Sequence, residues 1–182
     1  MQVRRLPRLA ARIAVALAVL APAAIVWSGP ASAYGSLSVV YALVDTDNCR
    51  RIEGQLWVTA GDNGCSLSDS ADGTFFEKDA GGRAQKVQLH DGVTMVAKIE
   101  FHPYGEKLWV YDTSNDGDTI YVTVAFGCLN SQVFGPYRAP GTSNPIDYTV
   151  VDFDVQEGCY VGIHVRDQPN DLDRITLQSA TT

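Results

Sequence analysis

The chain lacks the motifs that mark the common hydrolases and metalloenzymes. Its three histidines, His90, His102 and His164, form no HExxH or other paired-histidine motif, so their spacing does not indicate a catalytic zinc ion. No Gly-x-Ser-x-Gly elbow is present to expose a serine nucleophile. Glutamates that could pair for glycoside cleavage are scattered among many other acidic residues, which makes a functional pair the less favoured interpretation. We therefore expect a protein that is not an enzyme and needs no cofactor.

Basic residues are scarce outside the beginning of the chain. The whole sequence has 14 Lys and Arg residues against 21 Asp and Glu residues. Four of the arginines lie within residues 1–33, which leaves 10 basic and 21 acidic residues, a formal charge of −11, for residues 34–182. Such an acidic domain is repelled by the phosphates of nucleic acids and by anionic lipid surfaces. We expect neither as a partner.

Long apolar runs are also missing after residue 33, whereas the first 33 residues have the pattern of a signal peptide. Arginines precede the apolar segment 13–27, and Ala31-Ser32-Ala33 supplies the small-x-small cleavage pattern. Pro22 interrupts the apolar segment, which argues against a retained membrane anchor. We expect cleavage after Ala33 and a secreted, extracellular domain over residues 34–182. These 149 residues are enough for one domain with its own core.

Helical periodicity is absent from the expected mature chain, where apolar and polar residues alternate instead. Segments with this alternation, or rich in β-branched and aromatic residues, are 36–43, 52–59, 74–77, 84–89, 93–102, 107–112, 119–127, 146–155, 160–167 and 174–178. Turn residues such as those of Gly61–Gly64 separate them. Short strands at this spacing predict an antiparallel β-sandwich, jelly-roll-like or immunoglobulin-like, with little or no helix.

The four cysteines contain no CxxC pair, which argues against a zinc site. An even number of cysteines in an exported chain indicates two disulfides. Of the three pairings, we favour Cys49–Cys65 and Cys128–Cys159, because each closes a short loop between neighbouring strands. In the loop-entropy model each such closure stabilises the fold by about 3–4 kcal/mol.

The segment between the strands 107–112 and 119–127 contains a weak calcium motif. Its candidate oxygen ligands are Asp112, Ser114, Asp116 and Asp118. Gly117 occupies the sixth position, as in a calcium loop, but Thr123 stands at the twelfth position where a bidentate glutamate is required. Asn-Asp-Gly is also ordinary hairpin chemistry. We expect a plain turn without a metal, and bound calcium is the alternative.

Aromatic residues offer a second candidate site, a platform on which sugar rings could stack. Its candidate members are Trp57, Tyr104, Trp109, Tyr111, Tyr121, Phe134 and Tyr137. Trp109 and Tyr111 lie on one face of their strand, whereas Leu108 and Val110 lie on the other. One of these two faces must belong to the core, so we expect most of these rings to be buried. Carbohydrate stays an alternative ligand.

The beginning of the expected mature chain, Tyr34–Val44, is uncharged and rich in strand-forming residues. One interpretation is a first strand paired inside the domain. The other is an arm that adds to the sheet of a partner protein through main-chain hydrogen bonds and alternate side chains. The candidate partner-binding residues are Tyr34, Leu37, Val39 and Tyr41.

The run Val96–Thr113, followed by Asp116-Gly117-Asp118, resembles a family of small exported actinobacterial β-proteins. With the signal peptide, the size and the many strands, the chain also resembles the small adaptor subunits of umbrella toxin particles. In those secreted antibacterial complexes, the adaptor links a lectin-bearing subunit to a large toxin subunit through an extended amino-terminal segment. The resemblance implies that Tyr34–Val44 is this linking segment and that the partners are other secreted proteins.

We therefore expect a non-enzymatic, extracellular interaction module, with the role of an adaptor in a toxin complex as the main hypothesis. A carbohydrate-binding module is the first alternative, favoured if Trp and Tyr side chains line one exposed face. A secreted enzyme inhibitor is the second, because the turn Gly61–Cys65 resembles a stretch of the small amylase-inhibitor proteins.

Overall fold

The computed structural model describes residues 34–141, 144–169 and 174–182, so the expected signal peptide lies outside the described residues. Apart from one 3-10 turn, η1 (Gly127–Leu129), the regular elements in these ranges are all strands. They are β1 (Ser38–Asp45), β2 (Arg50–Gly54), β3 (Thr59–Gly61), β4 (Gly64–Leu67), β5 (Thr74–Glu77), β6 (Arg83–Asp91), β7 (Thr94–His102), β8 (Lys107–Asp112), β9 (Tyr121–Phe126), β10 (Gln132–Tyr137), β11 (Asp147–Asp152), β12 (Tyr160–Arg166) and β13 (Arg174–Thr181). Every pairing between them is antiparallel, which confirms the predicted all-β class.

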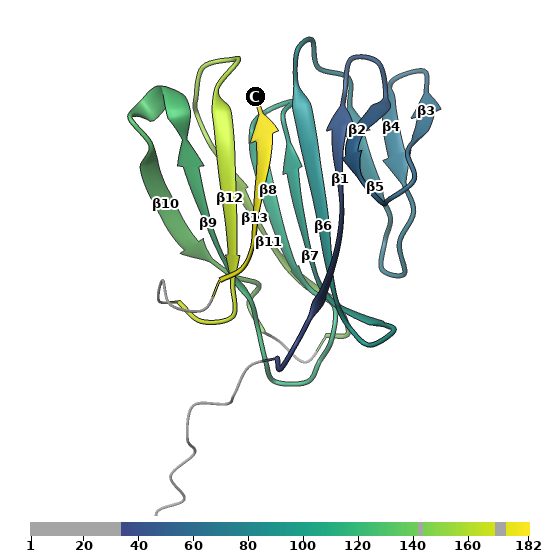
Figure 1. The fold of residues 1–182 in the computed structure, drawn as a ribbon, viewed down its shortest axis with the longest axis vertical. Helices are drawn as coiled ribbons and strands as arrows, with labels where there is room; N and C mark the ends of the chain where they lie inside the picture. Colours follow the sequence, from purple (N-terminus) through teal and green to yellow (C-terminus); the bar gives the residue numbers. More distant parts are fainter. Residues whose placement is uncertain (1–33, 142–143, 170–173) are drawn as a thin grey trace, which may run out of the picture. The chain divides into compact units, whose positions relative to one another are not determined.

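The larger sheet forms two layers that face each other. One layer has the order β10-β9-β12-β13, and the other has β6-β7-β8-β11, with β1 beside β6 and β2 beside β1 (Figure 1). A single residue pair, Thr181 with Arg83, joins β13 to β6. Side chains from both layers meet in one cluster, which includes Val124 and Ile163 from the first layer and Val87 and Ile99 from the second. The predicted β-sandwich is therefore confirmed.

Alternation along each strand decides which residues enter this core. Leu108 and Val110 of β8 are completely buried in it, so Trp109 and Tyr111 point to the opposite face of the layer. Burying one such aliphatic side chain stabilises the fold by about 1.5–3 kcal/mol. The sandwich core thus turns the aromatic side chains of β8 away from itself, and this outer face carries the candidate site.

A second, smaller sheet has the strand order β3-β4-β5, and we call it the small sheet. Figure 1 shows it beside β1 and β2. Its apolar residues form a separate cluster with β1 and β6, in which Ala42, Cys65 and Phe76 are completely buried. The small sheet therefore packs on the outer face of the larger sheet, where it borders the aromatic side chains of β8.

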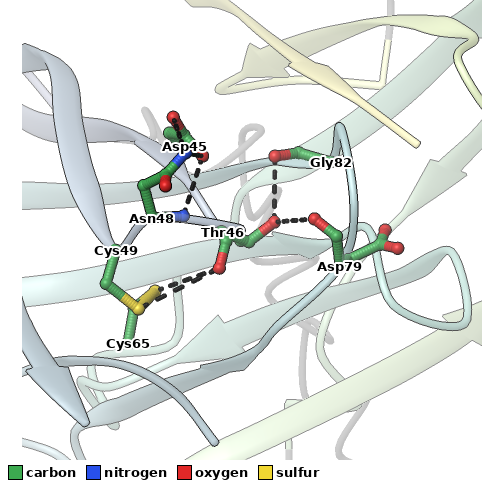
Figure 2. Close-up of a disulfide and its surroundings, with 7 residues drawn as sticks. All are labelled: Asp45, Thr46, Asn48, Cys49, Cys65, Asp79 and Gly82. Carbon is green, nitrogen blue, oxygen red and sulfur yellow. Dashed lines mark hydrogen bonds between the residues drawn. A yellow bond between two sulfur atoms is a disulfide. The ribbon is translucent and has the colours of Figure 1, made fainter. Parts of the chain in front are cut away.

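Both expected disulfides, Cys49–Cys65 and Cys128–Cys159, are confirmed, with Cα–Cα distances of 5.1 and 5.4 Å. The first joins the turn after β1 to β4 of the small sheet, and Thr46 lies beside it (Figure 2). The carbonyl oxygen of Thr46 is 3.7 Å from Cys65 Sγ. The hydroxyl group of Thr46 donates a hydrogen bond of 2.9 Å to the carbonyl oxygen of Gly82. This contact ties the disulfide to the start of β6.

The prediction of one continuous strand over residues 52–59 is wrong. Strand β2 ends at Gly54, where φ is +95° and a Cβ atom would lie 2.1 Å from the carbonyl oxygen of Tyr41. That oxygen instead accepts hydrogen bonds from the backbone N–H groups of Gln55 and Leu56, at 2.8 and 3.2 Å. The chain leaves the larger sheet at this point, and β3 begins only at Thr59.

Strand β10 is not among the segments predicted from the sequence, and it contains Gly135 and Pro136, which are rare inside strands. The strand forms the edge of its layer, and β9 is its one partner among the described strands. Its register shifts between Phe134 and Tyr137, the stretch that contains Pro136. An edge strand tolerates proline, because no second neighbour needs the missing N–H group.

The amino-terminal segment is an integral strand rather than a free arm. Strand β1 pairs with β6 along its whole length, from Ser38 opposite His90 to Asp45 opposite Arg83. The four candidate partner-binding side chains, Tyr34, Leu37, Val39 and Tyr41, pack partly buried against the sandwich core. An unpaired arm over Ser38–Asp45 is thereby ruled out in this fold, and a role of these four residues in binding a partner stays a prediction.

Among the residues that the structure describes, no helix has the length and the apolar character needed to cross a membrane.

Candidate functional site

The outer face of β7, β8 and β11 carries side chains in regular rows. Cross-strand register places Lys98 opposite Tyr111 and Tyr111 opposite Tyr148. In the next row, Glu100 lies opposite Trp109. Charged side chains of β7 therefore lie next to aromatic side chains of β8 and β11, on a face that the sandwich core does not use.

The aromatic side chains of these rows contact one another. The ring centroids of Trp109 and Tyr111 are 6.0 Å apart with an interplanar angle of 15°, and that of Tyr148 lies 5.4 Å from both. The ring of His102 lies 5.9 Å from Trp109 on the other side. These four rings form a continuous floor along the sheet.

A groove of about 820 Å³ runs between this floor and the small sheet, and we call it the aromatic groove. Its lining residues are Trp57, Thr59, Ser66, Leu67, Ser68, Asp72, Gly73, Thr74, Phe75, Glu100, His102, Trp109, Tyr111 and Tyr148. Trp57 is 77% exposed and Tyr148 is 52% exposed, so two large rings are available to a ligand. The volume lies within the range of small-molecule sites, about 300–1,000 Å³.

A buried set of charges holds one wall of the groove in place, and Asp69 is its centre. One carboxylate oxygen of Asp69 accepts from Lys86 Nζ at 2.6 Å and from Lys98 Nζ at 3.1 Å. The other oxygen accepts the backbone N–H groups of Ala71, Asp72 and Gly73, at 2.8, 3.1 and 3.0 Å. The side chains of Asp69 and both lysines are at most 1% exposed. The loop between β4 and β5 is therefore fixed to the outer face of β6 and β7.

Lys98 connects these charges to the floor of the groove. Its ammonium group forms ion pairs with Asp72 and with Glu100, the latter at 2.9 Å, and lies 4.1 Å from the centroid of the Tyr111 ring. Glu100 also accepts a hydrogen bond from Thr74 and lies 2.9 Å from His102 Nε2. We call Asp69, Asp72, Lys86, Lys98 and Glu100 the charged cluster.

The contacts of the two buried carboxylates determine their charge. Burial alone would raise the pKa of Asp69, but hydrogen bonds from Lys86 and from the Gly73 and Ala71 N–H groups outweigh it and hold the pKa well below its usual range. Burial opposes ionisation of Glu100 in the same way, and hydrogen bonding to His102 and the charge of Lys98 lower its pKa. Both groups are therefore carboxylates at neutral pH.

These shifts predict an acid-sensitive fold. Because the pKa values of Asp69 and Glu100 are lower in the folded than in the unfolded chain, their contribution to stability is complete above about pH 5 and is lost progressively as the pH falls further. Burial raises the pKa of Asp79, Glu106 and Asp112, which offsets part of the loss. Urea unfolding should give a lower midpoint at pH 3 than at pH 6, and Asp69→Asn should flatten this dependence. Equal midpoints for the unaltered protein would contradict the prediction.

The structure brings together part of the predicted aromatic platform. Trp57, Trp109 and Tyr111 line the groove, whereas Phe134 and Tyr137 pack against the sandwich core and Tyr104 and Tyr121 are not part of the groove lining. The sequence did not reveal the contributions of Tyr148, Phe75 or the charged cluster. Alternation could have placed Tyr148 on the outer face of its strand, but only the register with β8 places it beside Tyr111.

The candidate calcium loop uses its carboxylates for local turns. Asp112 accepts a hydrogen bond of 3.0 Å from the Ser114 N–H group, and Asp116 accepts one of 3.0 Å from the Asp118 N–H group. The hydroxyl group of Tyr34 donates to Asp116 at 3.3 Å. Within the described ranges, no group of three or more His, Cys, Asp or Glu side chains is arranged to hold a metal ion.

Comparison with known proteins adds no assignment, because no family model, curated protein or solved structure matches the chain.

Proposed function

We propose that the protein is a non-enzymatic glycan-binding module and that the aromatic groove is its binding site. The observation that carries this proposal is that the floor of Trp109, Tyr111 and Tyr148 and the exposed ring of Trp57 line one groove. The C–H faces of a pyranose ring stack well on aromatic rings, because they are apolar and flat. The hydroxyl groups at its edge need hydrogen-bonding partners, and the groove offers Asp72 and His102 among its polar side chains.

The charges around the groove support binding rather than glycoside cleavage. Cleavage needs a carboxylic acid that is still protonated when it meets the substrate, which requires a raised pKa. The pKa of Glu100 is lowered instead, and its side chain is only 3% exposed. Asp72 is engaged in an ion pair with Lys98. Neither carboxylate is thus prepared to act as a general acid.

The adaptor role implied by the resemblance remains a separate hypothesis. It concerns the amino-terminal segment rather than the groove, so both could apply to one protein. Among the described contacts, those of β1 are made within the chain and favour no particular partner.

Replacing the exposed rings tests the glycan-binding proposal. Tyr148→Ala and Trp57→Ala should each weaken glycan binding at least about tenfold, because each removes a stacking surface, while the melting temperature changes little. Affinity electrophoresis in gels containing soluble polysaccharides, followed by calorimetry with oligosaccharides, measures this.

A matched control is Tyr160→Ala, because Tyr160 is 57% exposed but lies outside the groove. It should leave binding unchanged. Equal losses in the Tyr148 and Tyr160 variants would show that the groove is not the site. If the unaltered protein binds no polysaccharide in a broad panel, the proposed function is wrong.

A further inference from the structure

We infer that the aromatic groove selects glycans that carry a positively charged amino group, as in 2-amino sugars, over neutral glycans. This inference rests on the proposed function, because it concerns the ligand of the same groove. It starts from the charges beneath the groove, which do not balance.

The charged cluster contains two lysines and three carboxylates, and therefore keeps one net negative charge with His102 counted as neutral. Four of its members have side chains that are at most 3% exposed, whereas the side chain of Asp72 is 49% exposed. Asp72 also lines the groove. The unbalanced charge is thus accessible to a ligand at Asp72, where it attracts an ammonium group by charge alone, whether or not that group carries N–H donors.

The aromatic rings add a second attraction for a cation. The faces of Trp and Tyr rings carry partial negative charge and attract ammonium groups. One such contact lies beneath the groove, where the buried Lys98 Nζ is 4.1 Å from the centroid of Tyr111. Tyr148 and Trp109 provide further ring surface close to Tyr111. An ammonium group in the groove would therefore meet both a carboxylate and ring faces.

The charge of the whole domain acts in the same direction. Residues 34–182 carry 10 basic and 21 acidic side chains, so the field around the protein attracts cations and repels anions. A polycationic glycan is concentrated near such a surface, and the groove then provides the specific contacts. An acidic polysaccharide would face repulsion at both stages.

Calorimetry at pH 7.5 with three matched tetrasaccharides tests the inference. The probes are β-1,4-linked N-acetylglucosamine, glucosamine, and N,N,N-trimethylglucosamine, whose charge does not depend on pH. The trimethylated tetrasaccharide should bind about tenfold more tightly than the acetylated one, and the difference should shrink in 0.5 M salt.

Asp72→Asn should reduce this preference to less than about threefold while the acetylated tetrasaccharide still binds. Because the substitution also weakens the contact with Lys98, a thermal melt checks that the variant is folded. The salt dependence of the preference in the unaltered protein tests the role of charge without any substitution. Glu157→Gln also removes one negative charge, but from an exposed residue outside the groove, and should leave the preference for the charged tetrasaccharide intact.

The possible results separate the two proposals. Equal binding of charged and neutral tetrasaccharides, or tighter binding of the neutral one, overturns the inference and leaves the glycan-binding proposal standing. If Asp72→Asn still prefers the charged tetrasaccharide, the cation binds elsewhere, and the inference is overturned as well. If Tyr148→Ala leaves the affinity for every tetrasaccharide unchanged, the groove is not the site and both proposals fail.

Discussion

Asp69→Ala is expected to lower the free energy of unfolding by about 3–5 kcal/mol. Among the described residues, Asp69 is the only ion-pair partner of Lys86, at 2.6 Å, and the other acceptor of Lys86 is the carbonyl oxygen of Leu67 at 3.4 Å, so the substitution leaves a buried, unpaired charge. It also removes the acceptor of three backbone N–H groups in the loop between β4 and β5. Urea unfolding followed by tryptophan fluorescence measures the loss.

Two variants serve as controls for the Asp69 prediction. Asp62→Ala removes an exposed carboxylate from the turn between β3 and β4, and should change stability by less than about 0.5 kcal/mol. The double variant Asp69→Asn with Lys86→Met removes both members of the buried pair, and should be more stable than Asp69→Ala. If Asp69→Ala costs no more than Asp62→Ala, the charged cluster does not stabilise the fold.

Removing either disulfide should also produce a large loss of stability, of different size for the two bonds. The sequence separations of 16 and 31 residues predict losses of about 3 kcal/mol for Cys49→Ala with Cys65→Ala and about 4 kcal/mol for Cys128→Ala with Cys159→Ala. Urea unfolding of the two double variants measures both values.

Glycan binding should depend on the first disulfide, whose removal costs less stability, and not on the second. The first holds β4 of the small sheet, which forms a wall of the groove, whereas the second joins η1 to the segment before β12 in the other layer. Glycan binding should therefore weaken in the first double variant and persist in the second. Equal binding by both would show that the small sheet keeps its position without its disulfide.

Sequence patterns predicted the position of two strands to the residue. Residues 74–77 and 107–112 are strands with the predicted bounds. The alternation of Leu108 and Val110 with Trp109 and Tyr111 indicated two faces, but both faces are apolar, so the sequence did not decide which one enters the core. Packing against the layer β10-β9-β12-β13 decides it, and every strand of that layer follows β8 in the chain.

The charged cluster could not have been predicted from local patterns. Lys86 and Lys98 alternate with core residues of β6 and β7, and this position normally faces solvent. They are buried because the loop containing Asp69 folds over them, and Asp69 is 29 residues away from Lys98 in the sequence. Contacts between residues so far apart in the sequence depend on the tertiary fold and leave no periodic pattern in the sequence.

The small sheet is a part of the protein whose groove-lining residues can change without disturbing the sandwich core. The chain leaves the larger sheet after Gly54 and returns to it at Arg83. Between these points, the loop before β3 contributes Trp57 to the groove, and β4 and β5 contribute Ser66 and Phe75, while none of the three belongs to the sandwich core. Exchanging these exposed lining residues while keeping Asp69, Cys65 and Phe76 would change one wall of the groove and leave its attachment intact. The same scaffold could thus present many specificities, as antibody frameworks do with their variable loops.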